Sequence, residues 1–293
     1  MLIDFHTHST ASDGELTPQA LLDRACARDI QCFAITDHDT VDGYLAVREI
    51  SQSLAVTLVS GVEFSCRWSG VTIHIVGLDM DVAHPAMQRG LECLGSARLA
   101  RGAKIAGRLL KLGIPDALEG AQREAGASQL GRPHFAAWMV GQGHVDTFNE
   151  AFDKYLGQGK PGDVKAFWPE LEEVTQWIVE AGGTAIIAHP LKYKLTRSKL
   201  RRLVADFKAA GGTAVELLNG RQTSDQTAVL CRLARECDLA VSAGSDFHRE
   251  SAYGADLGVE LRVPDGLDSV WAQFTDQRAV SARSKSDQSE DRA

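Results

Sequence analysis

Four short segments of this 293-residue chain each close an apolar, strand-like run with histidine or carboxylate side chains. They read Asp-Phe-His-Thr-His at 4–8, Thr-Asp-His-Asp at 36–39, Gly-Val-Glu at 61–63 and Ser-Asp-Phe-His at 245–248. Such side chains bind hard or borderline divalent cations when several strands aim them at one point. The pattern therefore favours folds that bring the ends of distant strands together.

Strand-like and helix-like segments alternate along most of the chain. We expect strands at 2–6, 31–36, 54–64, 71–78, 184–188, 214–218 and 240–243. We expect helices from Thr17-Pro18 onward and at 40–53, 169–181, 197–210 and 224–237. This alternation implies parallel strands joined by crossovers. About seven strands with polar residues at their carboxyl ends favour a closed α/β barrel over an open sheet.

The alternation is interrupted in the middle of the chain. Residues 100–165 are helical by composition and period, contain repeated glycines and show no convincing strand. We expect a helical insertion, or lid, at 100–165, and a discontinuous barrel domain made from 1–99 and 166–281. Residues 282–293 are rich in Ser, Asp, Arg and Lys without periodicity, which predicts a disordered tail.

Composition narrows the class of protein. A formal charge of −8 disfavours a protein that coats nucleic acid non-specifically. It still permits a small anionic substrate or an RNA end, because a few local cations suffice. The six cysteines include no C-x-x-C pair, which indicates reduced thiols in a cytoplasmic protein. No apolar run is long enough to span a bilayer, and no cleavable signal is expected.

Two pairs of candidate ligands share one spacing. His6 and His8 are two residues apart on an expected strand, so both imidazoles face the same way. Asp246 and His248 repeat this arrangement, and barrel closure would bring the two pairs together. Further candidates that follow strands are Asp13, His38 and Glu63. Together they favour a metal site over strand-end histidines without a metal.

These candidate ligands lie in segments that resemble the motifs of a known family. Residues 4–9, 35–39, 61–63, 131–134 (Gly-Arg-Pro-His) and 244–248 are similar to the motifs of the polymerase and histidinol phosphatase (PHP) superfamily. Residues 131–134 with 148–157 resemble its bacterial nucleoside 3′,5′-bisphosphate phosphatase branch, whose relatives are also described as 5′-to-3′ exoribonucleases. The resemblance implies a distorted (β/α)7 barrel that carries three metal ions.

The resemblance also assigns nine metal ligands. It gives the first metal His6, His8, Glu63 and Asp246. It gives the second metal Glu63, His74 and His134, so that Glu63 is the bridge. It gives the third metal Asp13, His38 and His248. It suggests manganese, while nitrogen and oxygen ligands without thiolate also suit zinc or iron. Some relatives carry histidine at the position of Asp13, so the resemblance implies an altered metal preference here without loss of binding.

This ligand set suits phosphate ester hydrolysis. Two metals that share a carboxylate can hold a hydroxide between them as the nucleophile. The cluster would also neutralise the phosphate oxygens during in-line attack, and the third metal would steady the leaving alkoxide. We expect no phospho-enzyme.

Other candidates sit beside this set. His189 follows a strand and is either a phosphate contact or general acid, or a structural histidine. Asp37 could orient a ligating imidazole as part of the catalytic apparatus, and Asp39 could do so or cap the next helix. Candidate substrate-binding residues are Lys192, Tyr193, Arg132, Asn219 and Arg221. The basic stretch 192–202 either grips a 5′-phosphate or RNA backbone or is a solvated helix face.

The leading functional hypothesis is a metal-dependent phosphoesterase acting on nucleoside 3′,5′-bisphosphates. It would remove the 3′-phosphate from 3′-phosphoadenosine 5′-phosphate, leaving AMP, and the same chemistry could trim RNA from its 5′ end. A histidinol-phosphate phosphatase is the alternative enzyme, and a non-catalytic metal-binding module is the alternative class. The sequence indicates no oligomeric state.

Overall fold

The strands of the protein form two sheets. The computed structural model describes residues 1–164, 168–250, 254–272 and 274. The smaller sheet contains, in spatial order, β3 (Thr57–Val59), β2 (Cys32–Ala34), β1 (Leu2–Asp4) and β9 (Val259–Glu260). The larger sheet contains β4 (Gly61–Trp68), β5 (Val71–Leu78), β6 (Thr184–Ile187), β7 (Ala214–Asn219) and β8 (Ala240–Gly244).

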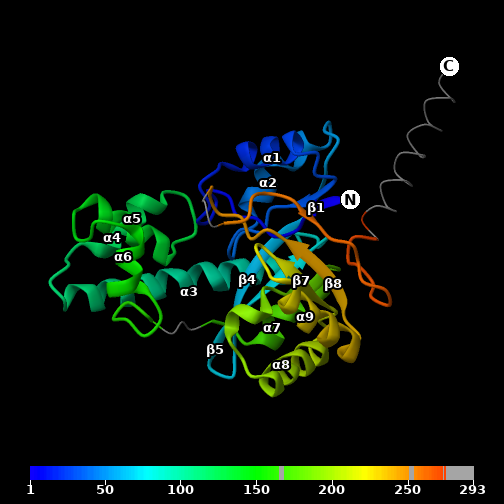
Figure 1. Ribbon diagram of the computed structural model, residues 1–293. Coiled ribbons are helices and arrows are strands. Elements are labelled where there is room, and N and C mark those ends of the chain that lie inside the picture. Colours follow the sequence, from blue (N-terminus) through cyan, green and yellow to red (C-terminus); the bar gives the residue numbers. More distant parts are fainter. Residues whose placement is uncertain (165–167, 251–253, 273, 275–293) are drawn as a thin grey trace.

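Helices flank both sheets at the positions that the sequence predicts. They are α1 (Pro18–Ala27), α2 (Asp42–Ser51), α7 (Leu171–Glu180), α8 (Arg197–Ala209) and α9 (Ser224–Cys237), with a short 3₁₀ helix η2 (Pro190–Tyr193). Figure 1 shows α1 and α2 on one side of the strands and α7, α8 and α9 on the other. The Thr17 hydroxyl caps α1 by accepting a hydrogen bond from the Ala20 amide, with Pro18 as the first helical residue.

The structure differs from the prediction in two places: the expected strand 54–64 is divided into two strands, and the connection to the next strand is a hairpin turn. The run 54–64 breaks at Ser60, so that β3 and β4 belong to different sheets. Strand β4 pairs antiparallel with β5 through Ser69 and Gly70, both at positive φ. The prediction of parallel strands is wrong here, and again between β5 and β6. Two residues can join antiparallel strands, whereas parallel strands need a crossover of a dozen residues or so.

The two sheets touch without forming one closed ladder among the described residues. The Phe5 amide donates a hydrogen bond to the Ala243 carbonyl at 3.1 Å, which sets the chain after β1 against β8. At the opposite contact, the Asp39 amide donates to the Glu63 carbonyl at 3.0 Å. Strands β1 and β8 are therefore neighbours, as predicted for the first and last strands of the sequence. A single hydrogen-bonded (β/α)7 barrel is not confirmed.

A separate group of helices projects from the sheets. It contains α3 (Pro85–Leu110), α4 (Ala117–Ala125), α5 (Arg132–Gly141), α6 (Phe148–Ala151) and the π-helical turn η1 (Phe152–Leu156). In Figure 1, α3 runs out from the strands, and α4, α5 and α6 gather around its far end. Met87 and Leu94 of α3 join the main core, whereas Ile105 and Leu109 join a second core within the projecting helices.

Further expectations from the sequence concern the start of α3, the cysteines, membrane spans and the C-terminal tail. Helix α3 begins well before the expected insertion, because His84 caps it and Pro85 is its first residue. All six cysteines are free thiols. In the part of the chain that the structure describes, no helix has the length and apolarity needed to cross a bilayer. The expected tail, 282–293, lies outside the described residues.

Candidate metal centre

The carboxylate of Glu63 is the centre of a cluster of imidazoles. Glu63 lies on β4 and its side chain is fully buried. Its Oε1 atom is 2.9 Å from Nδ1 of His74 and 2.9 Å from Nε2 of His189. His74 comes from β5 and His189 follows β6, so three neighbouring strands contribute to this side of the carboxylate.

The other carboxylate oxygen of Glu63 faces the smaller sheet. Its Oε2 atom is 2.8 Å from Nδ1 of His38 and 3.3 Å from Nε2 of both His6 and His8. His6 and His8 follow β1, and His38 follows β2. Glu63 thus lies between the two sheets and contacts histidines from both.

The pair at the end of the chain meets the pair at its start. Oδ1 of Asp246 is 3.6 Å from Nε2 of His6 and 3.4 Å from Nε2 of His8. The Asp246 amide donates to the His6 carbonyl at 2.8 Å, and the Phe247 carbonyl accepts from the His8 amide. These backbone bonds fix two segments some 240 positions apart in the sequence.

A third group of side chains surrounds Asp13. Its Oδ1 atom is 3.4 Å from Nε2 of His248, and its Oδ2 atom is 4.0 Å from Nε2 of His38. Nδ1 of His8 is 3.9 Å from the Asp13 carboxylate. Asp13 therefore lies among three imidazoles, although it sits in a loop.

Four overlapping groups in the described residues have ligand atoms close enough to share a metal ion. They are His8, Asp13, His38 and His248; His6, Glu63 and His189; His6, His8 and Asp246; and His38, Glu63 and His74. Of the sequence-predicted ligands only His134 is in none of them, and its Nδ1 accepts the Gly131 amide at the start of α5. His189, which the sequence suggested for another role, joins one group.

Several buried atoms of this cluster lack a hydrogen-bond partner among the described residues. They are Nε2 of His6, both ring nitrogens of His8, Nδ1 of His38, Oε2 of Glu63 and Nδ1 of His189. Leaving such atoms buried and unsatisfied costs about 1–3 kcal/mol each. Bound cations would satisfy these atoms, so the residues present fit divalent metal ions. Nitrogen and oxygen donors without thiolate suit manganese, iron or zinc.

The pKa values of the cluster are shifted by burial and by the charges of its members. Burial raises the pKa of the Glu63 carboxyl, but the nearby His38, His74 and His6 outweigh it and hold that pKa well below its usual range. Burial, and then the charges of His248 and His38, lower the pKa of His8 to about 3. The cluster therefore presents an ionised Glu63 carboxylate and a neutral His8 imidazole. Burial lowers the pKa of His38, but Glu63 and Asp13 outweigh it and raise that pKa to about 9, and Glu216 and Glu63 likewise raise the pKa of His6. A bound cation would displace the protons from these two imidazoles.

Glu216 holds His6 and His189 of the cluster in position, and it was not among the candidate residues predicted from the sequence. Its carboxylate is 2.9 Å from Nδ1 of His6 and accepts the His189 amide at 2.6 Å. It also accepts the side-chain amide of Asn219 at 3.0 Å. A proton on Nδ1 of His6 directed at Glu216 leaves Nε2 free for a metal. The sequence signal was a carboxylate within the apolar run of β7.

Asp37 and Asp39 support loops rather than imidazoles. Asp37 accepts the amide and hydroxyl of Ser9, at 2.7 and 2.6 Å, and the hydroxyl of Ser12 at 2.6 Å. Asp39 accepts the Ser65 amide and the Arg98 Nε, both at 2.6 Å. Asp39 does not cap α2, whose N-cap residue is Val41. Both carboxylates hold the backbone that carries the candidate ligands.

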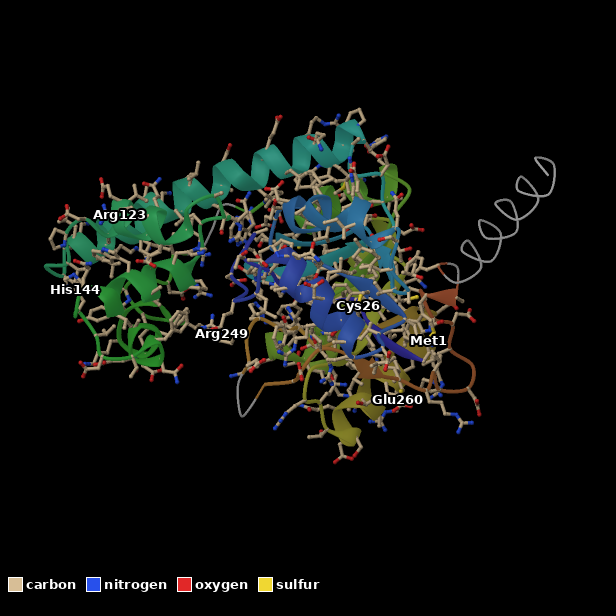
Figure 2. The ribbon with its side chains drawn as sticks, turned by 90° about the horizontal axis from the view of Figure 1, so that it is seen from above. Met1, Cys26, Arg123, His144, Arg249 and Glu260 are labelled. Atoms are coloured by element: carbon tan, nitrogen blue, oxygen red, sulfur yellow. The ribbon has the colours of Figure 1, made fainter. Side chains whose placement is uncertain are left out.

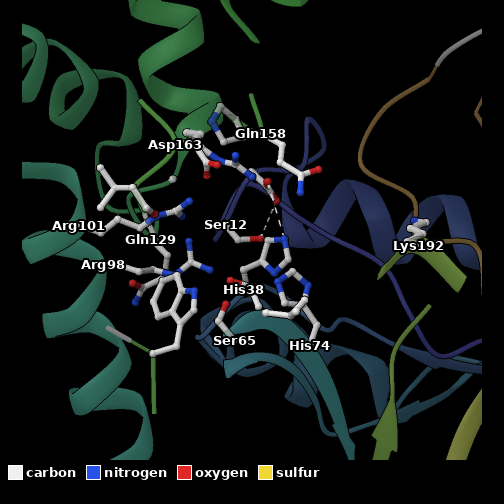
Figure 3. A pocket seen from close by; sticks show the side chains of 18 of the residues that line it. Ser12, His38, Ser65, His74, Arg98, Arg101, Gln129, Gln158, Asp163 and Lys192 are labelled. Carbon is white, nitrogen blue, oxygen red and sulfur yellow. Dashed lines mark hydrogen bonds and ion pairs between the residues drawn. The ribbon is translucent and has the colours of Figure 1, made fainter. Parts of the chain in front are cut away.

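A cavity of about 740 Å³ opens beside the cluster. Figure 3 shows His38 and His74 at its floor, with Arg98 and Arg101 across from them. The predicted contacts Lys192, Tyr193 and Arg132 also line it. The Lys192 ammonium pairs with the Asp246 carboxylate, and the Tyr193 hydroxyl accepts the His74 amide at 2.8 Å.

A smaller cavity of about 250 Å³ is also lined by Lys192. His189 and the predicted contacts Asn219 and Arg221 line it. Other basic residues of the stretch 192–202, namely Lys199, Arg201 and Arg202, line neither cavity. Arg201 instead pairs with Glu236, which favours a solvated helix face for that part of α8.

Histidines and carboxylates gathered at strand ends, without thiolates, define an α/β protein with a candidate multi-metal centre. Residues 4–106 match the PHP domain model. The chain is 42% identical over 285 residues to the 5′-3′ exoribonuclease Rnm of Escherichia coli, covering 97% of each. It is 38% identical to the 3′,5′-nucleoside bisphosphate phosphatase of Chromobacterium violaceum, covering 93% of this chain and 96% of the relative.

Two solved structures superpose on this chain over most of its length. A Chromobacterium violaceum protein described as an amidohydrolase superposes with a TM-score of 0.84 at 37% identity, covering 93% of this chain and 95% of the other. A Bifidobacterium adolescentis protein assigned as a metal-dependent phosphoesterase gives 0.75 at 26% identity, covering 90% and 92%. The chain belongs to the PHP-domain family, and its α/β fold is that of the family.

Proposed function

We propose that this protein is a metal-dependent phosphoesterase that hydrolyses the 3′-phosphate of nucleoside 3′,5′-bisphosphates. Removal of nucleotides from 5′-phosphorylated RNA would be a related activity at the same site. The observation that carries the proposal is the cluster of imidazoles and carboxylates around Glu63 at the floor of a large cavity. The names of the two relatives support these substrates.

The proposed ligands fall into three sets. His6, His8, Glu63 and Asp246 would hold one ion, and Asp13, His38 and His248 another. Glu63 and His74 would contribute to a further ion. The family resemblance suggests His134 as its third ligand, but the imidazole of His189 lies nearer, with Nε2 2.9 Å from the Glu63 carboxylate. We propose manganese, with zinc and iron as the alternatives.

Bound divalent ions would supply the charge that lowers the pKa of a water and stabilises the phosphoryl group during in-line attack. The chain's own part is to position the reacting groups. Water oxygen would bond to phosphorus as the bond to the 3′ oxygen breaks, and that oxygen would take up a proton. His189, which borders the second cavity beside Glu63, would deliver it in the arrangement in which His134 and not His189 completes the ligands of the further ion. Lys192, between the two cavities, would face the phosphate oxygens.

We further propose that the two sheets act as a distorted barrel of the PHP type and that residues 100–165 form a lid. In support, Ser128 and Gln129, in the loop between α4 and α5, donate hydrogen bonds to the carbonyls of Thr10 and Ala11. Those carbonyls belong to the loop that carries Asp13. The lid would thereby be attached directly to a candidate ligand loop.

An assay panel with added manganese tests the proposed function. The panel contains adenosine 3′,5′-bisphosphate, a 2′,5′-bisphosphate, histidinol phosphate and a 5′-phosphorylated oligoribonucleotide. We expect the highest kcat/KM on the 3′,5′-bisphosphate, with nucleotide release from the oligoribonucleotide, and loss of both after chelation. A strong preference for histidinol phosphate would instead support the alternative phosphatase.

A further inference from the structure

The smaller of the two cavities beside the metal centre is more than a mononucleotide needs. It has a volume of about 250 Å³ and shares Lys192 with the larger cavity. In Figure 3, His38 and His74 lie between Lys192 and the pair Arg98 and Arg101. Complete small-molecule sites usually measure about 300–1,000 Å³. The larger cavity can therefore hold a mononucleotide by itself, and the smaller one suits a further part of a longer ligand.

Hydrogen-bonding side chains line most of this smaller cavity. They belong to His189, Lys192, Asn219, Arg221, Gln222 and Gln226. His189 and Asn219 are more than nine-tenths buried. Nε2 of His189 is 2.9 Å from the Glu63 carboxylate, and the Asn219 side-chain amide donates to Glu216 at 3.0 Å. The buried Nδ1 of His189 has no hydrogen-bond partner among the described residues, so the ring retains hydrogen-bonding capacity beyond Glu63.

Arg221 gives the smaller cavity a positive charge that is not neutralised locally. Within the described ranges, no carboxylate oxygen lies within 4.0 Å of its guanidinium. Lys192 differs, because its ammonium pairs with the Asp246 carboxylate. A guanidinium carries five N–H donors in a planar fork that matches the oxygens of a phosphate. Arg221 therefore suits a phosphate group at this cavity.

The loop that carries Arg221 is fixed against the strand that leads to the last two candidate ligands. Gly220 precedes it with a φ of 55°, and the Gly220 amide donates to the carbonyl of Gly244, the last residue of β8, at 3.0 Å. The Gln222 side-chain amide donates to the Leu217 carbonyl at 2.7 Å. A wall that is already held in place loses little conformational freedom when a ligand binds.

Resting on the proposed function, we infer that the smaller cavity is a subsite for the RNA on the 3′ side of the scissile phosphate. In RNA the scissile phosphate joins two nucleosides, whereas the 3′-phosphate of a bisphosphate is attached to one. The first nucleotide of the RNA would occupy the larger cavity, and the second would pass Lys192 into the smaller one. The phosphate that follows the second nucleotide would then bind Arg221. A site that also serves mononucleotides would thus have a region that only RNA fills.

Comparing the first cleavage of the 5′-phosphorylated triadenylate pApApA with hydrolysis of adenosine 3′,5′-bisphosphate tests this subsite. Only the triadenylate continues beyond the scissile phosphate. For Arg221→Gln we expect the ratio of kcat/KM on the triadenylate to kcat/KM on the bisphosphate to fall about 10- to 100-fold, mainly through KM of the triadenylate. Arg221→Lys should recover part of the loss, because it restores the charge without the planar fork.

Two exposed arginines that line neither cavity provide controls. Arg232 lies on α9, which follows the cavity loop, and Figure 2 shows Arg123 toward the outer end of the projecting helices. Arg232→Gln and Arg123→Gln should leave the ratio at its wild-type value. A wild-type ratio in Arg221→Gln, or the same fall in the controls, would overturn the subsite while leaving the proposed function intact.

Inorganic phosphate, which hydrolysis of a bisphosphate releases, is another anion that Arg221 could bind. Product inhibition by added phosphate distinguishes it from RNA. If Arg221→Gln weakens this inhibition and leaves the ratio unchanged, the cavity takes the released phosphate, and the RNA subsite is overturned.

Binding of 3′-fluorescein-labelled pApApA to the manganese-loaded protein, measured by fluorescence anisotropy, separates the two proposals. If the wild-type protein cleaves neither substrate, the proposed function fails. The subsite then stands only if Arg221→Gln weakens binding of the triadenylate by at least about tenfold and Arg232→Gln does not. Unchanged affinity in Arg221→Gln would overturn it.

Discussion

Glu63 and His74 lie on one face of the β4–β5 hairpin, and Oε1 of Glu63 is 2.9 Å from Nδ1 of His74. In the hairpin register Glu63 pairs with Val76, and His74 is two residues from Val76. Residues two apart on a strand face the same side, so the pairing makes Glu63 and His74 diagonal neighbours. The tight turn at Ser69 and Gly70 therefore helps to build the candidate metal centre.

Glu63→Gln should remove bound metal and activity together. An amide keeps the size of the side chain but loses the negative charge that faces five imidazoles. We expect kcat/KM to fall by more than about 100-fold. That is more than the roughly 10- to 100-fold loss usual for residues that only hydrogen-bond to metal ligands. Metal content by mass spectrometry and phosphatase assays check this. Glu49→Gln on the exposed face of α2 is the control, and full metal content in Glu63→Gln would refute the cluster.

Glu216→Gln should weaken metal binding without abolishing it. The Glu216 carboxylate faces three N–H groups, and an amide has only one oxygen and would turn an NH₂ group toward a donor. We expect metal affinity to fall about 10- to 100-fold. Competition with a chelator measures it. Glu236→Gln on α9, where the side chain is exposed, should behave as wild type. Equal affinities in both variants would contradict the positioning role.

Arg98→Met should destabilise the protein. Arg98 and Asp39 form a buried ion pair, and removing one partner leaves an uncompensated charge. The expected loss is about 3–5 kcal/mol in the free energy of unfolding. Thermal unfolding of Arg98→Met and of the double variant with Asp39→Asn measures it. Asparagine tolerates the positive φ at position 39, so the double variant should recover part of the loss. An unchanged melting temperature in Arg98→Met would contradict this account.

Gly244→Ala should disturb the contact between β8 and the chain that carries His6. A methyl group there would lie 2.3 Å from the His6 Cβ and 2.7 Å from its amide nitrogen. Such overpacking costs about 1–3 kcal/mol and would displace His6 from the cluster. Gly95→Ala in α3 is the matched control, because its methyl group meets open space. That change should stabilise the helix by about 0.5–1 kcal/mol. Equal melting temperatures and metal content in both variants would contradict the prediction.

Local sequence patterns predicted most elements and most candidate ligands. The Thr17-Pro18 signal predicted α1, and the two-residue spacing predicted that His6 and His8 face one way. Three features escaped prediction. Glu216 lies inside an apolar strand, Arg101 on an ordinary helix, and Ser69 with Gly70 forms a turn that reverses a strand. Glu216 and Arg101 take their roles from residues far away in the sequence, whereas the turn at Ser69 and Gly70 is a local feature between two adjacent strands.

By itself the sequence determined which residues end strands and carry metal-binding side chains, because capping, apolar runs and strand periodicity are local properties. Only the tertiary structure decided which of them meet. Glu63 collects histidines from both sheets because β4 lies where the sheets touch. His134 is in none of the four groups, and its Nδ1 accepts the Gly131 amide at the start of α5. Backbone pairing between distant segments sets these distances, and a one-residue change in register would turn the side chains away.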